Sequence, residues 1–281
     1  MPIKIIKPVT KGQRNISYVD ESGLTRNAPR VRSLLKRGKK IDGRSRGTIT
    51  IRHRGGGTRP QYRIVDFNGR EKIGVPGKII ALEYDPNRTA YIALVCFADG
   101  DKRYHLAHKG AKVGDEIITN TEGKPKDGMR LPLTKIPVGF SIFNLEITPL
   151  KGGQTVRSAG QSAKLISLDG DMAQVAMPSG EIRLVNKNNF ATIGAVSNDE
   201  HSLERIGKAG RVRKMGRRPI VRGKVMNPVD HPHGGGEARN PIGMKHPKTP
   251  WGACALGVKT RNKKKATSRF ILKSRHRANK K

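Results

Sequence analysis

The densest group of chemically reactive side chains lies in one short stretch, Asn227–Pro241, with the sequence NPVDHPHGGGEARNP. Two histidines, an aspartate and a glutamate occur there beside three prolines and a run of three glycines. These residue types are found in metal sites and hydrolytic active sites. They are equally found in irregular segments that lie against another macromolecule, so both interpretations are open.

The histidines do not have the spacing of a common zinc site. His231 and His233 are two residues apart, Glu237 follows, and His246 lies further along the chain. Zinc ligands usually come as HExxH on a helix or as paired CxxC turns, and neither pattern occurs. Pro232 fixes φ between the histidines, and the glycine run beyond them is hard to pre-organise. We therefore predict no metal and no cofactor.

A catalytic triad would need a nucleophile that the sequence does not identify. Asp230 adjoins His231, and Ser179 or Ser202 could serve as nucleophile. Neighbouring residues rarely point at each other, however, and a triad is defined by roles in three dimensions. The GxSxG turn is absent. We predict that the chain is not an enzyme, and a hydrolase centred on His231 and His233 remains the rival hypothesis.

Basic residues beside closely spaced glycines recur along the chain. A glycine backbone can approach a sugar-phosphate chain closely and adopts φ > 0 without penalty, while Arg supplies a planar fork for phosphate or base edges. None of these segments is a GxxxxGK[ST] phosphate loop. Together they predict nucleic-acid contact, in five segments: Arg52–Arg59, Lys151–Gly160, Arg205–Pro219, Val221–Pro228 and Asp230–Arg239.

Positive charge is concentrated at the two ends of the sequence. The 281 residues carry a net charge of +35, of which residues 1–60 hold +13, residues 61–200 hold +2 and residues 201–281 hold +20. Segments this cationic usually stay disordered until a polyanion neutralises them. Nucleic acid is the natural partner because each Lys or Arg on a phosphate releases condensed counterions. The alternative is a generically basic protein that binds any acidic surface.

The nearly neutral middle has the texture of short strands separated by turns. We first predict five strands, enough to close a small barrel of the oligonucleotide-binding type. Asp99-Gly100 is the predicted hairpin turn between two of them. They are followed by a linker over Thr121–Leu133 and by a meander typical of an SH3-like barrel. The first set is Tyr62–Phe67, Lys78–Tyr84, Ala90–Phe97, Lys102–Ala107 and Asp115–Thr119, and the second is Ser141–Thr148, Ala163–Leu168, Met172–Met177 and Glu181–Val185.

These elements predict an all-β protein of two small barrels, OB-fold then SH3-like, with long irregular basic N- and C-terminal extensions. The expected domains are a basic extension over residues 1–60, an OB-fold-like RNA-binding barrel over 61–125, an SH3-like barrel over 126–200 and a basic extension over 201–281. No stretch approaches the ~18 apolar residues of a membrane span, and no signal peptide is visible. Cys96 and Cys254 lie far apart, which suits a reducing compartment. We expect a soluble, cytoplasmic protein.

RNA is favoured over DNA as the partner. The sequence contains no helix-turn-helix, zinc-finger or basic-zipper pattern that would place a helix in a major groove. Irregular RNA offers pockets and bulges that extended tails can enter, and small β-barrels commonly bind such shapes with their loops.

Five motifs of the sequence together indicate a resemblance to a known family. In their order and spacing they closely resemble the universal large-subunit ribosomal protein two family, bacterial type, from about Lys7 to the C-terminus. The motifs are RGTITIRHRGGG (Arg46–Gly57), YDPNRTAYIALVCFADGDKRY (Tyr84–Tyr104), IPVGFSIFNLEI (Ile136–Ile147), KGGQTVRSAGQSAKLI (Lys151–Ile166) and VMNPVDHPHGGGEARNPIG (Val225–Gly243).

The resemblance implies a structural constituent of the large ribosomal subunit. Family members are primary rRNA binders that support subunit association and tRNA binding, touch the small subunit at an intersubunit bridge and extend towards the peptidyl-transferase centre. Expected partners are therefore large-subunit rRNA, small-subunit rRNA or protein, and other large-subunit proteins, with no membrane. The histidine of the family's DHPHGGG motif falls on His231, but peptide-bond formation is attributed to rRNA, so no enzyme is implied.

The chain departs from the family pattern at two places. The family commonly has HGGGEGR where this chain has Ala238 before Arg239. After RHRGGG it often has a basic run, where this chain has Thr58-Arg59-Pro60. One or two phosphate contacts are therefore absent or are supplied from elsewhere, for example by Arg63.

The predicted RNA contacts combine the basic-glycine segments with the cationic tails. The rival to sequence-specific rRNA binding is a histone-like compactor that binds all RNA alike. The predicted contact residues are Arg52, His53, Arg54, Gly55, Gly56, Gly57, Arg59, Arg63, Lys151, Arg157, Arg211, Arg213, Arg217, Arg218, Arg222, His231, His233, Gly234 and Arg239.

Overall fold

Antiparallel strands make up most of the regular structure in the computed structural model of the chain, which describes residues 3–38, 43–237, 240–262 and 264–275. In these ranges there is one α-helix, α1 (Ala209–Lys214). The predicted all-β class is thus confirmed. None of the helices in these ranges is long and apolar enough to cross a membrane. Short 3-10 turns occupy Lys11–Gln13, Arg32–Leu34, Arg70–Lys72, Leu133–Lys135, Asp199–Leu203, Gly223–Val225 and Ala266–Phe270.

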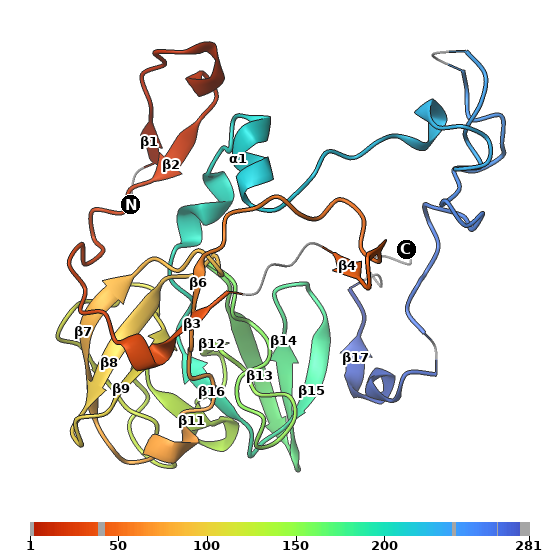
Figure 1. Cartoon of the computed structure of the whole chain (residues 1–281). Helices are drawn as coiled ribbons and strands as arrows, with labels where there is room; N and C mark the ends of the chain where they lie inside the picture. Colours follow the sequence, from red (N-terminus) through yellow and green to blue (C-terminus); the bar gives the residue numbers. More distant parts are fainter. Residues whose placement is uncertain (1–2, 39–42, 238–239, 263, 276–281) are drawn as a thin grey trace. The chain divides into compact units, whose positions relative to one another are not determined.

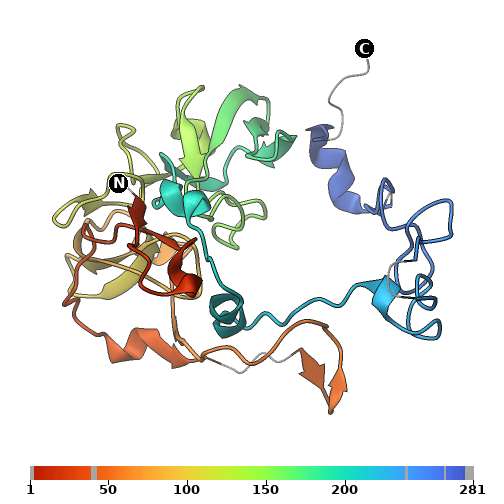
Figure 2. The ribbon, with the colours of Figure 1, turned by 90° about the horizontal axis from the view of Figure 1, so that it is seen from above.

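The chain divides into two compact units, and each is described by itself. Unit 1 consists of Met1–Lys39, Arg59–Lys208 and Arg269–Lys281, and unit 2 consists of Lys40–Thr58 and Ala209–Ser268. Of the strands labelled in Figure 1, all except β4 belong to unit 1. The blue part of unit 2 runs as an irregular trace in both views (Figures 1 and 2).

The first sheet of unit 1 has four antiparallel strands in the order β10-β7-β8-β9. Its strands are β7 (Gly77–Glu83), β8 (Ile92–Phe97), β9 (Lys102–Leu106) and β10 (Glu116–Ile117). Because side chains alternate along a strand, Ile92 and Leu94 enter one apolar cluster while Ala93 and Val95 enter another. Strand β8 is therefore buried on both faces. The predicted turn at Asp99-Gly100 is confirmed and joins β8 to β9.

The second sheet of unit 1 has seven antiparallel strands in the order β11-β16-β12-β13-β14-β15-β17. The predicted meander is confirmed as β13–β15, whose side chains Leu165, Ala173, Val175 and Val185 enter one core. Strand β17, from the far end of the chain, pairs with β15. The strands are β11 (Arg130–Pro132), β12 (Ser141–Phe143), β13 (Ala163–Asp169), β14 (Met172–Ala176), β15 (Ile182–Asn186), β16 (Phe190–Ile193) and β17 (Ile271–Lys273).

Three two-stranded ladders complete the regular structure. In unit 1, β1 (Ile3–Ile5) pairs with β2 (Ser17–Val19), and β3 (Leu35–Arg37) pairs with β6 (Gln61–Arg63). In unit 2, β4 (Arg44–Ser45) pairs with β5 (Thr48–Ile49).

The structure differs from the expected elements at several places. The expected strands Asp115–Thr119 and Ser141–Thr148 shorten to β10 and β12, and strands β1–β3, β11, β16 and β17 were not predicted. The expected strand Tyr62–Phe67 shortens to β6, which ends at Arg63. Beyond it the Asp66 carboxylate accepts hydrogen bonds from the N–H groups of Asn68 and Gly69 (2.8 and 2.9 Å), which turns the chain. The expected linker Thr121–Leu133 contains β11, where Arg130 and Leu131 are buried. Strand β16 was not predicted, although all four of its residues are buried.

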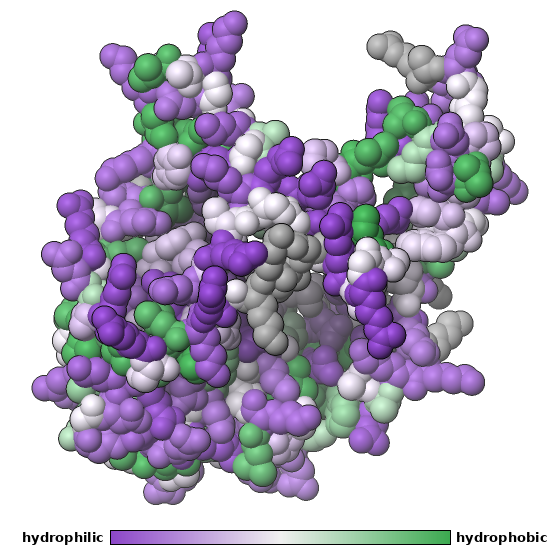
Figure 3. Space-filling model, in the orientation of Figure 1, coloured by the Kyte–Doolittle hydropathy of each residue, from purple (hydrophilic) through white to green (hydrophobic). Residues whose placement is uncertain are grey.

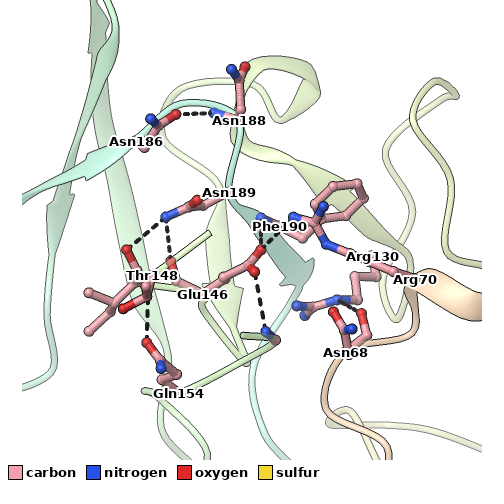
Figure 4. Close-up of polar contacts among 12 residues, drawn as sticks. Asn68, Arg70, Arg130, Glu146, Thr148, Gln154, Asn186, Asn188, Asn189 and Phe190 are labelled. Atoms are coloured by element: carbon pink, nitrogen blue, oxygen red, sulfur yellow. Dashed lines mark hydrogen bonds and ion pairs between the residues drawn. The ribbon is translucent and has the colours of Figure 1, made fainter. Parts of the chain in front are cut away.

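A buried carboxylate links the segment before the first sheet to the second sheet (Figure 4). Glu146 is fully buried and accepts hydrogen bonds from the backbone N–H groups of Gly152 (3.2 Å) and Phe190 (3.0 Å). The Arg70 guanidinium lies 3.0 Å from the same carboxylate. The charge of Glu146 is thus compensated by three donors, as a buried charge requires.

The Arg130 side chain lies beside this carboxylate cluster and is itself buried (Figure 4). Its Nε donates to the carbonyl oxygen of Asn68 (3.0 Å), and its Nη1 donates to that of Asn144 (2.8 Å). Burial lowers the pKa of Arg130 to about 10, so the guanidinium is still charged at neutral pH. The buried charges of Glu146 and Arg130 are therefore held by polar groups from both halves of the sequence of unit 1.

Candidate nucleic-acid interface

A groove of about 400 Å³ in unit 2 is lined mainly by arginines and glycine backbone. Its four arginines are exposed, and in the described part of the chain none of them forms an ion pair with a carboxylate. Such a groove presents permanent positive charge with free hydrogen-bond donors. The lining residues are Arg44, Ile49, Ile51, Arg52, His53, Arg54, Gly55, Gly56 and Arg218.

The β4–β5 ladder and the turn that follows it form one wall of this groove. The carbonyl oxygen of Gly43 accepts hydrogen bonds from the N–H groups of Thr50 (2.8 Å) and Ile51 (2.9 Å), which folds the chain back after β5. Arg46 and Gly47 both have positive φ at the turn between the strands. Arg44 and Arg52 are thereby fixed on a backbone with defined geometry, although no apolar core is formed by the residues of unit 2 that the structure describes.

Two of the five predicted basic-glycine segments, Arg52–Arg59 and Arg205–Pro219, lie side by side in the structure. Residues 53–58 run antiparallel to residues 214–218, with a bridge between Arg54 and Arg217. The Nδ1 of His53 also lies 3.0 Å from the carbonyl oxygen of Pro219. The backbone N–H to carbonyl bonds are Gly55 to Gly216 (3.0 Å), Arg218 to His53 (3.0 Å) and Thr58 to Lys214 (2.9 Å).

Gly57 allows this contact because it has no side chain. A Cβ built on Gly57 would lie 2.7 Å from the Cα of Gly216, a distance that real Cβ atoms essentially never show. The glycines are predicted to approach RNA closely, whereas Gly57 approaches another segment of its own chain. Gly56 differs, because a Cβ there would meet nothing within 4 Å.

The predicted arginines of the C-terminal segment lie on α1 and in the extended chain that follows it. Arg213, Arg217 and Arg222 are exposed, and Arg211 is half-buried on α1. Cations in the last turn of a helix interact favourably with its carbonyl end, which is consistent with Arg213 and Lys214 at the end of α1.

The two histidines of DHPHGGG stabilise the loop in which they lie. His231 is 8% exposed, and its Nδ1 accepts a hydrogen bond from the backbone N–H of His233 (3.0 Å). The Nε2 of His233 accepts from the backbone N–H of Lys248 (2.8 Å). A Cβ on Gly223 would lie 2.4 Å from the His231 ring, so that glycine is needed for the packing. The Nδ1 of His231 is thus bonded to backbone and not to Asp230.

Gly234 has a similar internal role. A Cβ on Gly234 would lie 2.2 Å from the carbonyl oxygen of Asn227. The VRGKVMNP and DHPHGGGEAR segments are therefore in contact, as are Arg52–Arg59 and Arg205–Pro219. In the described ranges there is no group of three or more His, Cys, Asp or Glu side chains arranged to hold a metal ion.

The predicted contacts in unit 1 are spread over separate sites. Arg63 is paired with Glu83 (3.3 Å) and Asp85 (3.8 Å), so its charge is compensated within the protein. Arg157 lies over the Phe67 ring, 4.4 Å from the centroid.

The other predicted residues outside the groove have different positions. Arg59 and Lys151 are exposed. Arg239 lies outside the described residues, as does Ala238. Arg44 lines the groove but was not predicted, although the RSRG sequence around it has the same basic-glycine composition as the five chosen segments.

Two family models match the chain. Residues 31–119 match "Ribosomal Proteins L2, RNA binding N-terminal domain" and residues 126–252 match "Ribosomal Proteins L2, C-terminal domain". The two matched ranges together cover most of the 281 residues. They include the groove residues from both segments of unit 2, the first sheet of unit 1 and all strands of its second sheet except β17.

Proposed function

The chain belongs to the ribosomal protein L2 family, and from this membership we propose that it is a primary rRNA-binding protein. It is an RNA-binding component of the large ribosomal subunit in the cytoplasm. We propose further that it supports subunit association and tRNA binding and forms part of the surroundings of the peptidyl-transferase centre, without acting as an enzyme. Its proposed partners are large-subunit rRNA, small-subunit rRNA or protein at an intersubunit bridge, and other large-subunit proteins.

The groove of unit 2 is the observation that carries this proposal. Four arginines line it without carboxylate partners in the described residues. Each guanidinium can bind a phosphate through two parallel N–H···O bonds, which a point charge such as Lys cannot do. The exposed backbone at Gly56 leaves room for a sugar-phosphate chain to approach. We therefore place an RNA backbone in this groove.

The remaining predicted residues form a secondary set of contacts. In this proposal Arg213, Arg217 and Arg222 extend the groove along unit 2, and Arg59, Lys151 and Arg157 contact RNA from unit 1. Arg63 is left out because Glu83 and Asp85 compensate its charge. His231 and His233 act by holding the loop that carries their neighbours.

We also propose that the two sheets are parts of two barrels. Residues 61–125 would form the OB-fold-like barrel and residues 126–200 the SH3-like barrel, between basic extensions at 1–60 and 201–281. Strands β7–β10 fall in the first range and β11–β16 in the second, which supports the division.

The test is binding of the full-length protein to large-subunit rRNA and to random RNA of equal length across a salt series. The groove variant carries Arg52→Gln, Arg54→Gln and Arg218→Gln. The control variant carries Lys124→Gln, Lys126→Gln and Lys164→Gln, which removes the same charge from exposed residues of unit 1. The groove variant should reduce the salt slope of log affinity by about 2, since each lost phosphate contact removes 0.7–0.9.

Two outcomes would contradict the proposal. Equal affinity of the wild-type protein for cognate and random RNA would favour a non-specific compactor. Equal losses in the groove and control variants would show that net charge, rather than the groove, determines binding.

A further inference from the structure

Trp251 is the only tryptophan of the chain, and its side chain is 81% exposed. Tryptophan is large and mostly apolar, so exposing it to water is unfavourable unless a partner covers it. The aromatic content of the chain is 4%, and most of the large aromatic side chains in unit 1 are buried or half-buried. The exposure of Trp251 therefore points to a ligand.

The backbone around Trp251 is fixed by hydrogen bonds. Lys248 and Cys254 form an antiparallel bridge, and the N–H of Thr249 donates to the carbonyl oxygen of Ala253 (2.7 Å). The N–H of Gly252 donates to the carbonyl oxygen of Thr249 (2.9 Å), with Gly252 at φ 83°. Trp251 is thus displayed at the tip of a tight turn with little backbone freedom to lose on binding.

One face of the indole is already next to a cation. The guanidinium carbon of Arg52 lies 5.3 Å from the centroid of the Trp251 ring, within the range of a cation–π interaction. Arg52 also lines the arginine groove. The indole and the groove therefore share a residue, and the second face of the indole is open because the side chain is so exposed.

A nucleobase fits this site better than an apolar protein pocket. Unit 2 carries a net charge of +17. A protein pocket that covered Trp251 would also have to desolvate Arg52, which is costly for an unpaired charge. A nucleotide offers both a flat π-face for the indole and a phosphate for the guanidinium. The combination of an aromatic ring and a basic groove is typical of sites for unpaired bases.

We propose that Trp251 stacks on an unpaired nucleobase of the bound RNA while Arg52, beside it, contacts the phosphate of the same strand. This inference rests on the proposed RNA-binding function and identifies the part of the RNA, an unstacked base, that the groove recognises. It assigns a base-contacting role to a residue that lies outside the five basic-glycine segments.

The intrinsic fluorescence of the full-length protein tests the proposal directly, because Trp251 is the only indole. A base in van der Waals contact quenches indole emission by electron transfer. Titration with large-subunit rRNA should therefore quench the emission in parallel with binding measured by filter retention. Quenching that does not track binding would overturn the proposal.

Variants provide a second measurement. Trp251→Leu should weaken rRNA binding by about 10-fold, within the range of one base–aromatic stack. Trp251→Phe keeps an aromatic face and should stay within about 3-fold of wild type. The matched control is Leu256→Ala, a change at another exposed apolar residue of unit 2 (75% exposed). It should leave the affinity unchanged.

The outcomes separate this inference from the proposed function. If the chain does not prefer large-subunit rRNA, the proposed function fails. If it binds rRNA normally but emission is unquenched and Trp251→Leu binds as wild type, only the stacking role fails. Blue-shifted emission without quenching would place the indole in an apolar pocket and would likewise overturn the stacking role.

Discussion

Unit 1 and unit 2 place their apolar side chains in opposite ways. Every buried hydrophobic residue of the described chain belongs to unit 1. In unit 2 most of the large apolar residues are exposed, among them Ile220 (76%), Val229 (90%) and Trp251 (81%), and His231 is the only buried side chain among the residues described there. Green residues accordingly appear on the surface of the part of unit 2 that Figure 1 draws in blue (Figure 3).

This difference indicates where each unit obtains its stability. Burial of apolar area is the main driving force of folding, and unit 1 has it. Unit 2 has a net charge of +17, and its described residues form no apolar core, so its cations repel one another without a compensating gain. Its conformation depends on hydrogen bonds, on close glycine contacts and, in our proposal, on RNA. Substitutions should therefore act on folding in unit 1 and on binding in unit 2.

Arg130→Ala should have the largest effect on unit 1. The change leaves the carbonyl oxygens of Asn68 and Asn144 buried without their donors and opens a cavity beside the Glu146 cluster. Loss of one member of a buried charged network costs roughly 3–5 kcal/mol. Urea unfolding followed by far-UV circular dichroism measures the loss.

Lys164→Ala is the matched control, because Lys164 is an exposed cation on β13 of the second sheet. It should change the free energy of unfolding by less than about 0.5 kcal/mol. A loss below about 1 kcal/mol for Arg130→Ala would mean that the buried guanidinium contributes little to unit 1.

Acid should have the next largest effect, again on unit 1. Burial lowers the pKa of His105 from 6.5 to about 4 and also lowers that of His108. The unfolded chain therefore binds protons below pH 6.5 that the folded chain does not, and stability falls as the pH drops from 6.5 towards 4. We expect a loss of about 1–2 kcal/mol for His105 between pH 7 and pH 5.

The measurement is the free energy of unfolding at a series of pH values, and the slope of that free energy against pH is compared between wild type and variant. His105→Gln should flatten the slope between pH 6.5 and pH 5, whatever its effect at pH 7. An unchanged slope in this variant would assign the acid sensitivity to other groups.

His231→Ala should have the smallest effect on folding. His231 contacts Gly223 and the backbone of His233, both in unit 2, so the unfolding of unit 1 should change by less than about 0.5 kcal/mol. The loop around it should become more sensitive to protease, and rRNA affinity should fall because neighbouring groups lose their fixed positions. A loss of more than 1 kcal/mol in unit 1 would show that the two units are energetically coupled.

The same contrast explains which features could be predicted from sequence. Strands β7, β8, β9, β13, β14 and β15 were predicted because each has apolar residues at strand spacing between turn signals. Strand β16 was missed because it has only four residues and no alternation, whereas β8, which is also buried on both faces, is a longer apolar run between turn signals. Strand β11 was missed because Arg130 resembles a surface residue, and only its burial between carbonyl groups makes it part of the core.

In unit 2 the composition predicted a basic, glycine-rich segment but not its geometry. The contact between Gly57 and Gly216 joins residues far apart in sequence, and no local pattern encodes it. Trp251 had no signal beyond its residue type, because its significance comes from its exposure and from Arg52 next to it. The partner of Arg63 was equally hidden, since nothing in its neighbourhood indicates Glu83.

Strand β17 also determines how the chain is tethered. Strand β17 pairs with β15 and so returns the chain to unit 1 after the longer segment of unit 2 ends at Ser268. The shorter segment ends at Thr58, and the chain re-enters unit 1 at Arg59. Both segments of unit 2 are therefore closed loops anchored at each end, rather than free tails. Anchoring restricts the volume that the loops can search, so after the first RNA contact the others form at high effective concentration. Truncation after Phe270 would convert the larger loop into a free tail while keeping every residue of the groove.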